Sequence, residues 1–281
     1  MQTNAPLDFS FDNRVVGQYD ALRGHPPQVA STIGSALVQA LGPQDSLAGS
    51  ARPCVLELGV GTGRIALPVA AAGARVVGID LSGDMLATLA GHLHRDPADI
   101  DLVRGDITAL PFAPHSFDAA MVTHVLHLVA DWSRVLQRLA AVVKPQGALL
   151  LGRDWVDPAS MAGQIRMAFR QAVMQQGFKT AAPAGGPVLH QALLDIGATP
   201  VAVGPGELIA AEWTARISPA DVLRGIASRD DAESWVLPDE VLLPVCATLE
   251  HFVAERWPEK ETPQEILRRF VVAVYRTAGH S

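Results

Sequence analysis

The feature that most constrains the fold is a glycine-rich stretch at residues 57–64, Glu-Leu-Gly-Val-Gly-Thr-Gly-Arg, which continues a short apolar run. An alanine- and leucine-rich segment with high helix propensity follows it. Three glycines at alternate positions allow positive φ and a close approach of backbone to a ligand. The pattern predicts a buried parallel strand, a tight turn and a helix whose N-terminus faces a ligand, the first βα unit of a doubly wound α/β nucleotide-binding fold.

The glycine spacing narrows the class of ligand. A dinucleotide fingerprint reads G-x-G-x-x-G, but here the third glycine, Gly63, comes one residue early, which disfavours an NAD-dependent oxidoreductase. The chain also lacks the G-x-x-x-x-G-K-[ST] pattern of a phosphate-binding loop. Glu57 would repel a polyphosphate and would suit a ligand that carries positive charge.

Composition excludes several partners. The 281 residues carry 22 basic and 29 acidic side chains, a net charge of −7, whereas a protein that binds nucleic-acid phosphates is expected to be basic. Cys54 and Cys246 are far apart, which suggests neither a disulfide framework nor a zinc site. Residues 1–12 lack a signal layout, and no apolar run reaches the ~18 residues of a membrane span. We expect a cytoplasmic protein, and the sequence gives no indication of its oligomeric state.

The chain after the first strand alternates strands and helices. A second strand at residues 75–80 ends in Asp80, and in doubly wound folds an acid there accepts the hydroxyls of a ribose. Ser82 is the expected N-cap of the next helix, and Asp131 caps another that runs to Val143. Further strands are expected at 100–104, 116–122, 148–152 and 266–275, and residues 200–211 are expected to form one strand or a bent pair. Further helices are expected at 27–41, 158–177, 188–196, 218–228 and 239–257.

Five segments occur in order and at matching spacings: ELGVGTGR, GIDLSGDML, GDITALPF, SFDAAMV and VVKPQGALLL. Together they resemble the core of the class I S-adenosylmethionine (SAM)-dependent methyltransferases, most of all the branch of ubiquinone/menaquinone-biosynthesis and other small-molecule enzymes. The resemblance covers about residues 50–155, and Gln146 stands where a glycine is more usual. Residues 11–27, FDNRVVGQYDALRGHPP, resemble the N-terminal lid of that branch.

The resemblance implies a Rossmann-like, seven-stranded, mostly parallel sheet with a helical N-terminal lid and a helical cap inserted before the last strand. We expect three parts: a lid and helix at residues 1–43, a SAM-binding core at 44–157, and cap helices with completing strands at 158–281. The tryptophans of the last part, Trp213, Trp235 and Trp257, are expected in the core of the cap.

The resemblance also implies the cofactor SAM, with S-adenosylhomocysteine as product. The glycines would line its methionine end, and Glu57 would face its cationic amino group. Asp80 would hold the ribose, and Asp106 would accept a hydrogen bond from the adenine amine. Leu81, Met85 and Ile107 would sandwich the ring. Tyr19 and Arg23 lie four residues apart, so on a helix they share a face, from which they would close over the cofactor. The residues expected at the cofactor are Tyr19, Arg23, Glu57, Gly59, Gly61, Gly63, Asp80, Leu81, Met85, Asp106, Ile107, Thr123 and His124.

Residues 153–155, Arg-Asp-Trp, follow the fifth strand and are a candidate wall of the substrate pocket. Substrate should dock beyond the carboxyl ends of the strands, and after the fourth strand residues 123–128 read Thr-His-Val-Leu-His-Leu. This segment lacks the Asn/Asp-Pro-Pro-aromatic tetrapeptide of enzymes that methylate nucleic-acid bases, so we expect a small-molecule acceptor. His127 is the expected general base, because resembling enzymes often carry a histidine in a Leu-His pair at this position, and His124 is its rival. Either histidine could instead contact the cofactor or brace the loop.

Two alternatives remain open from the sequence. The chain could be a SAM-binding protein of the same fold without methyl-transfer turnover, and the accepting atom could be oxygen, nitrogen or carbon. His124, His127 and Asp131 are spaced too loosely to indicate a metal site, so we expect no metal.

Overall fold

A computed structural model describes residues 24–42, 52–178, 186–201, 207–230 and 232–279. These residues fall into two compact units. The core unit takes its described residues from 24–154, 186–211 and 270–279, and the helical unit takes its own from 155–178 and 212–269. The boundaries between the units, at residues 154–155, 211–212 and 269–270, fall inside three strands. Each of these strands therefore contributes residues to both units.

The sheet has the strand order β3-β2-β1-β4-β5-β8-β6, with β7 paired to β8 outside this path. The pairs β1–β2, β1–β4, β2–β3 and β4–β5 are parallel, and β6–β8 is antiparallel. The strands are β1 Cys54–Leu58, β2 Arg75–Asp80, β3 Ile100–Arg104, β4 Phe117–Thr123, β5 Val143–Val156, β6 Thr199–Pro200, β7 Leu208–Ile217 and β8 Gln264–Arg276. The predicted mostly parallel α/β sheet is confirmed. The described residues form eight strands in place of seven, because residues 200–211, expected as one strand or a bent pair, include parts of both β6 and β7.

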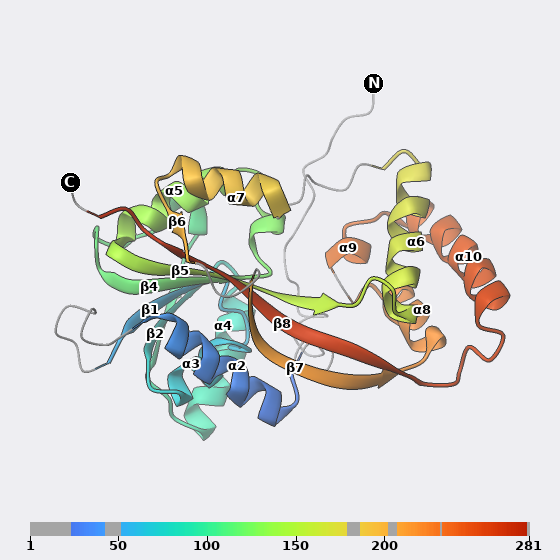
Figure 1. Cartoon of the computed structure of the whole chain (residues 1–281), viewed down its shortest axis with the longest axis horizontal. Coiled ribbons are helices and arrows are strands. Elements are labelled where there is room, and N and C mark those ends of the chain that lie inside the picture. Colours follow the sequence, from blue (N-terminus) through green and yellow to red (C-terminus); the bar gives the residue numbers. More distant parts are fainter. Residues whose placement is uncertain (1–23, 43–51, 179–185, 202–206, 231, 280–281) are drawn as a thin grey trace. The chain divides into compact units, whose positions relative to one another are not determined.

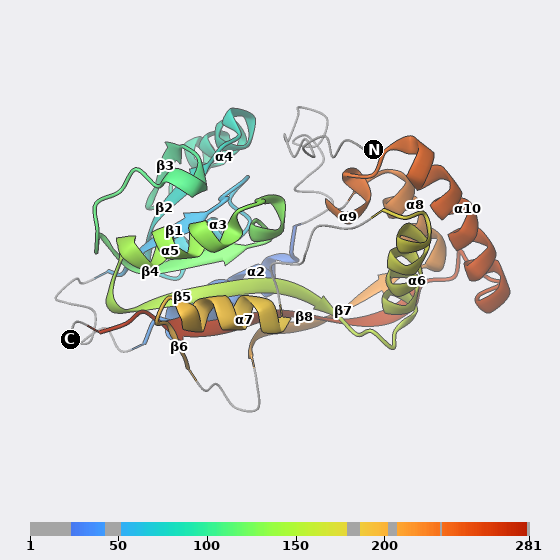
Figure 2. The ribbon, with the colours of Figure 1, turned by 90° about the horizontal axis from the view of Figure 1, so that it is seen from above.

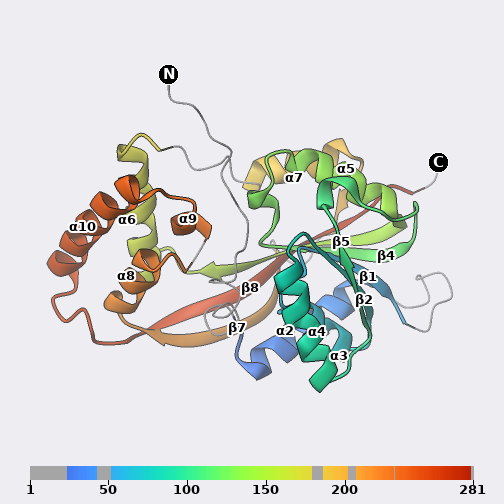
Figure 3. The ribbon, with the colours of Figure 1, turned by 180° about the vertical axis from the view of Figure 1, so that it is seen from behind.

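Helices cover both faces of the sheet in the core unit (Figures 1 and 3). On one face lie α2 Pro27–Ala40, α3 Ala66–Ala71 and α4 Gly83–Arg95; on the other lie α5 Trp132–Val142 and α7 Gly186–Asp195. Figure 2 shows α5 and α7 in front of the sheet. Between them and the strands the core buries Leu56, Leu58, Ile79, Leu136 and Leu149. The apolar runs predicted as strands are therefore those that the helices cover.

Two of the helices begin where the sequence predicts. The Ser82 hydroxyl accepts a hydrogen bond from the Met85 amide at 3.3 Å, and Asp131 accepts one from the Arg134 amide at 3.3 Å. Such caps satisfy amides that the first turn of a helix leaves without partners. Helix α5 ends at Val142 and not at Val143, because Val143 already pairs with Phe117 of β4.

Strand β5 is longer than the predicted residues 148–152. Residues 144–147, predicted as a turn, form an irregularity within the strand, where its register against β4 shifts between Phe117 and Ala119. Gln146 adopts a φ of +61° there, a left-handed conformation that favours glycine. Glycine is usual at this position in the resembling enzymes, and the left-handed conformation explains why, although the sequence pattern alone does not reveal it.

The helical unit contains α6 Met161–Gln175, α8 Pro219–Ala227, the four-residue α9 Ala232–Trp235 and α10 Asp239–Arg256 (Figure 1). Its buried core is built from Ile165, Phe169, Val245, Leu249 and Val253, and Trp257 packs against it. The three long helices were predicted within a few residues, whereas α9 was not. The role of these helices as a cap, and the three-part division at residues 43 and 157, stay predictions. No helix in the described ranges has both the length and the apolar character needed to cross a bilayer.

Candidate cofactor and active site

The glycine loop joins the end of β1 to α3, and all three glycines have positive φ: +66° at Gly59, +54° at Gly61 and +90° at Gly63. The Gly59 amide donates to the Ile79 carbonyl of β2 at 2.8 Å. A Cβ at Gly59 would lie 2.7 Å from Val125, and one at Gly63 would lie 2.5 Å from Leu89, whereas one at Gly61 would meet nothing within 4 Å. Two glycines are thus required by packing, and no described atom occupies the space next to the Cβ position of Gly61.

Glu57 lies in β1 just before this loop and is almost completely buried, with 3% of its surface exposed. Burial raises the pKa of its carboxyl from 4.5 to about 8; Asp80 adds to the rise, and Arg64 opposes it. One of its oxygens, Oε2, is buried without a hydrogen-bond partner among the described residues. A buried acceptor without a partner is costly, and a bound cation or N–H donor would satisfy it.

Asp80 ends β2 beside the same loop. Its Oδ2 accepts from the Gly61 amide at 2.9 Å, and its Oδ1 accepts from the Ser82 amide at 2.8 Å. Burial raises the pKa of the Asp80 carboxyl, while these backbone donors lower it. Each carboxylate oxygen has a second lone pair, so both can accept a further hydrogen bond from a vicinal diol such as a ribose.

The residues expected around an adenine ring differ in exposure. Leu81 is 68% exposed, although it is a large apolar residue next to Asp80, whereas Met85 and Ile107 are buried. Asp106 is exposed and caps a short 3₁₀ turn, η2 Ile107–Ala109, through a 2.8 Å hydrogen bond from the Thr108 amide. Of the three apolar residues, Leu81 therefore offers the open surface on which a ring could stack.

Strand β4 ends at Thr123, and His124 follows it with a φ of +53°. Positive φ is uncommon for residues other than glycine and is found at functional sites. His127 lies one turn later in the 3₁₀ segment η3 Leu126–Leu128 and is half-buried. Both histidines follow the carboxyl end of β4 as predicted, and their catalytic roles stay predictions.

The structure adds a cluster around Asp154, near the carboxyl end of β5. The Asp154 carboxylate contacts His25 Nε2 at 2.9 Å, Arg64 Nη1 at 3.0 Å and His124 Nε2 at 3.0 Å. Burial would raise the pKa of Asp154, but hydrogen bonds from His124 and His25 and the positive charge of Arg64 hold it well below its ordinary value. The cluster joins the glycine loop to the ends of β4 and β5.

Sequence reasoning identified Asp154 only as part of a pocket wall and did not single out His25 or Arg64. These residues are 129 and 90 positions from Asp154 in the chain, so no local pattern links them. The available signal was that Arg64 follows the third glycine and Asp154 follows the fifth strand, both at one edge of a parallel sheet. Tyr19 and Arg23, the expected lid residues, lie outside the described residues.

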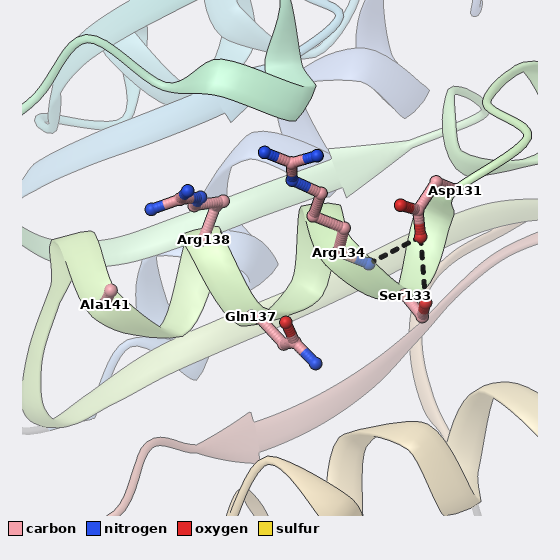
Figure 4. Close-up of a pocket in the computed structure, with 6 residues that line it drawn as sticks. All are labelled: Asp131, Ser133, Arg134, Gln137, Arg138 and Ala141. Carbon is pink, nitrogen blue, oxygen red and sulfur yellow. Dashed lines mark hydrogen bonds between the residues drawn. The ribbon is translucent and has the colours of Figure 1, made fainter.

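Other features of the described residues do not contribute to this site. No group of three or more histidine, cysteine or acidic side chains there could hold a metal ion. Figure 4 shows a surface pocket formed by α5 and its N-cap residue, and its lining residues are Asp131, Ser133, Arg134, Gln137, Arg138 and Ala141. None of these is an expected cofactor or catalytic residue. In that pocket Asp131 accepts from the Ser133 hydroxyl and the Arg134 amide, as expected of a helix cap.

Residues 56–151 match the methyltransferase domain family. This segment is therefore similar to a methyltransferase domain. It spans β1 to β5 and thus includes the glycine loop, Asp80, Asp106 and both histidines. SAM is the cofactor that the sequence resemblance implies for this domain. The residues at its site fit that molecule. Glu57 Oε2 is a buried acceptor with no partner among the described residues, Asp80 can accept further hydrogen bonds from a ribose, and Leu81 is exposed.

The chain is similar to named relatives over about a third of its length. It is 41% identical over 97 residues to a demethylmenaquinone methyltransferase of Paenarthrobacter aurescens (strain TC1), covering 34% of this chain and 37% of that protein. It is 37% identical over 108 residues to the ubiquinone/menaquinone biosynthesis C-methyltransferase of Syntrophotalea carbinolica, covering 38% of this chain and 45% of that protein. The chain thus spans less than half the length of these relatives.

The fold of the chain is also found in solved structures. The YcgJ protein from Bacillus subtilis matches 88% of this chain and 99% of its own, with a TM-score of 0.54 and 15% sequence identity. The matched share exceeds the methyltransferase domain and reaches into the rest of the chain. At this identity the match shows the fold alone.

Proposed function

We propose that this protein is an enzyme that transfers a methyl group from SAM to a small-molecule acceptor and releases S-adenosylhomocysteine. The observation that carries the proposal is the edge formed by the glycine loop and the ends of β1 and β2. There, a buried Glu57 oxygen that has no partner in the part of the chain that the structure describes lies beside an Asp80 carboxylate already fixed by two backbone amides. An acidic edge of this kind suits a cationic ligand and not a polyphosphate.

Each residue at this edge has a proposed role. Gly59, Gly61 and Gly63 let the backbone approach the methionine part of the cofactor, and Glu57 accepts from its amino group. Asp80 accepts the ribose hydroxyls, Asp106 the adenine amine, and Leu81 stacks on the ring, with Met85 and Ile107 behind it. Tyr19 and Arg23 would close over the cofactor, with the Arg23 guanidinium paired to its carboxylate. Thr123 and His124 contact the cofactor from the end of β4.

The cofactor supplies a methyl group on a sulfonium sulfur, and its S–CH₃ bond breaks as the acceptor forms a bond to that carbon. The chain's own residues therefore have three tasks. They hold the acceptor in line with the sulfur, exclude bulk water, and remove a proton where the acceptor carries one. His124 and His127 are the two proposed bases, since both follow β4 on the side where substrates dock in this fold.

The similarity to demethylmenaquinone methyltransferases supports a quinone-related acceptor as the first compound to test. The net charge of −7 and the absence from the sequence of the Asn/Asp-Pro-Pro-aromatic tetrapeptide support a small molecule over nucleic acid. A cytoplasmic location is part of the proposal and is supported by the composition of the chain. Its two distant cysteines, both free thiols, suit a reducing compartment.

The test incubates the full chain with methyl-deuterated SAM and a reduced short-chain demethylmenaquinone, and then with a panel of small hydroxy- and amino-compounds. Mass spectrometry should detect a deuteromethylated product together with S-adenosylhomocysteine. A matched reaction with the Asp80→Asn variant at the same SAM concentration controls for chemical methylation. SAM binding without any product across the panel would favour the alternative, a cofactor-binding protein without turnover. Failure to bind SAM would overturn the proposal.

A further inference from the structure

Asp154 is a buried carboxylate with three basic neighbours from different parts of the core unit. His25 precedes α2, Arg64 ends the glycine loop, and His124 follows β4. The side chains of Asp154 and Arg64 are 14% and 12% exposed, and that of His25 is 3% exposed. A carboxylate surrounded by such donors stays ionised at neutral pH, so Asp154 is a fixed negative charge beside His124.

His124 contacts Asp154 twice through the same ring nitrogen. Its Nε2 lies 3.0 Å from Asp154 Oδ2 and 3.2 Å from the Asp154 backbone nitrogen. A carboxylate oxygen only accepts and a backbone amide only donates, so each contact belongs to a different tautomer. The contact to the ionised carboxylate is the charge-assisted one and is the stronger of the two. It favours the tautomer with the proton on Nε2 and the lone pair on Nδ1.

The backbone at His124 supports a functional role for this arrangement. Its φ of +53° is a left-handed conformation that costs free energy in a residue other than glycine. Such strain persists where the surrounding structure imposes it, and it clusters at active sites. Here it occurs at the first residue after β4, on the edge where this fold places its substrates.

We propose that Asp154 is the positioning residue of the methyl-transfer reaction, and that it fixes the His124 tautomer whose Nδ1 removes the proton of the acceptor. This inference rests on the proposed function and selects His124 over His127 as the base. As the acceptor forms its bond to the methyl carbon, its proton passes to His124 Nδ1. The positive charge that leaves the sulfonium therefore appears on the imidazolium, where Asp154 stabilises it. Arg64 and His25 keep Asp154 from taking that proton itself.

The direct test is the tautomer of His124 in the wild-type full chain with S-adenosylhomocysteine added, measured by long-range ¹H–¹⁵N NMR on ¹⁵N-histidine-labelled protein. The spectrum of the His124→Gln variant identifies the resonances. We expect the proton on Nε2 at a pH above the titration midpoint. A proton on Nδ1, with Nε2 accepting from the Asp154 amide, would overturn the inference. This measurement requires no acceptor and does not depend on whether an Asp154 variant folds.

A second measurement uses the titration of the same ring. Loss of the Asp154 charge in Asp154→Asn should lower the His124 midpoint by about one pH unit or more, because an adjacent anion stabilises imidazolium. Asp154→Glu should restore part of the shift. Asp101→Asn is the matched control, since Asp101 is an exposed acid of the same unit, paired with Arg75, and this variant should leave the midpoint unchanged. An equal midpoint in wild type and Asp154→Asn would contradict the inference.

Kinetics separate this inference from the proposed function. With a reduced short-chain demethylmenaquinone as probe and SAM at saturating concentration, His124→Gln should lower kcat about 10²–10⁴-fold and remove the histidine-dependent rise of kcat with pH. If wild type transfers methyl groups and His127→Gln alone shows this loss, His127 is the base and the inference fails. If wild type transfers nothing, the proposed function fails, whatever the tautomer of His124.

Discussion

The Gly61 amide donates a 2.9 Å hydrogen bond to Asp80 Oδ2, which links the middle of the glycine loop to the end of β2. The other carboxylate oxygen accepts from the Ser82 amide at the start of α4. One side chain thus fixes the loop after β1 and the entry into the next helix. The proposed ribose contact and the shape of the loop depend on the same carboxylate, so a ligand that uses Asp80 meets a preorganised site.

Glu57 should release a proton when SAM binds. Burial raises the pKa of its carboxyl from 4.5 to about 8, so at pH 6.5 the free protein holds it protonated, and a cation beside it favours the ionised form. Calorimetric titrations of SAM in two buffers of different ionisation enthalpy measure this release. The observed enthalpies should differ in the wild type and agree in Glu57→Gln. Equal enthalpies in the wild type would contradict the role assigned to Glu57.

The same carboxyl should make the free protein less stable at alkaline pH. Its pKa is higher in the folded chain than the ordinary value of 4.5, so its contribution to stability is greatest below pH 4.5 and is lost as pH rises through about 8. Glu57→Gln removes this ionisation, and its melting temperature relative to wild type should therefore be higher at pH 9 than at pH 6. A pH-independent difference between the two proteins would show that Glu57 does not titrate as described.

Gly63→Ala should destabilise the fold. A Cβ there would lie 2.5 Å from Leu89 Cδ1, a fully buried side chain, at a φ of +90°. Overpacking and strain of this kind cost about 1–3 kcal/mol. Gly91→Ala is the matched control, because Gly91 lies in α4 with nothing within 4 Å of its Cβ position, and alanine is the better helix former. Unfolding in urea should show a loss for the first variant and none for the second.

The predicted closure of the N-terminal segment over the cofactor involves residues outside those that the structure describes. If residues 9–23 close over the cofactor, their amide hydrogen exchange should slow when SAM is added, because a segment ordered by a ligand exchanges less. Tyr19→Ala and Arg23→Ala should weaken SAM binding without changing the melting temperature of the free protein. Equal exchange with and without SAM would favour a helix that packs permanently on the core.

The sequence carries enough information to predict the shape of the glycine loop and the start of α4, because their determinants are local. Three glycines in a short loop, an acid at the end of the next strand and a serine cap occupy fixed places in a βα repeat. Positive φ at all three glycines and the cap at Ser82 confirm those predictions. The length of β5 was not predictable from its pattern, because Gln146 bends the strand where the composition of residues 144–147 indicates a turn.

The cluster at Asp154 lay beyond sequence reasoning for a different reason. His25, Arg64 and His124 meet one carboxylate from three separate elements, and such contacts arise only when the strands are in register. The sequence therefore identified His124 as a candidate without the partner that sets its tautomer. The prediction of His127 rested on the resemblance of its Leu-His pair, and the structure does not test it.

The most direct test of the account is a calorimetric titration of SAM into wild type, Asp80→Asn and Asp101→Asn. Wild type should bind one SAM per chain. Asp80→Asn replaces the charged acceptor of the proposed ribose hydrogen bonds with a neutral amide. A hydrogen bond to a charged group contributes about 1.5–3 kcal/mol, so the SAM affinity of this variant should fall roughly 10- to 100-fold. Asp101→Asn, which removes an exposed acid paired with Arg75, should bind as wild type does. A folded Asp80→Asn protein with wild-type affinity, or a wild type that does not bind SAM, would contradict the account.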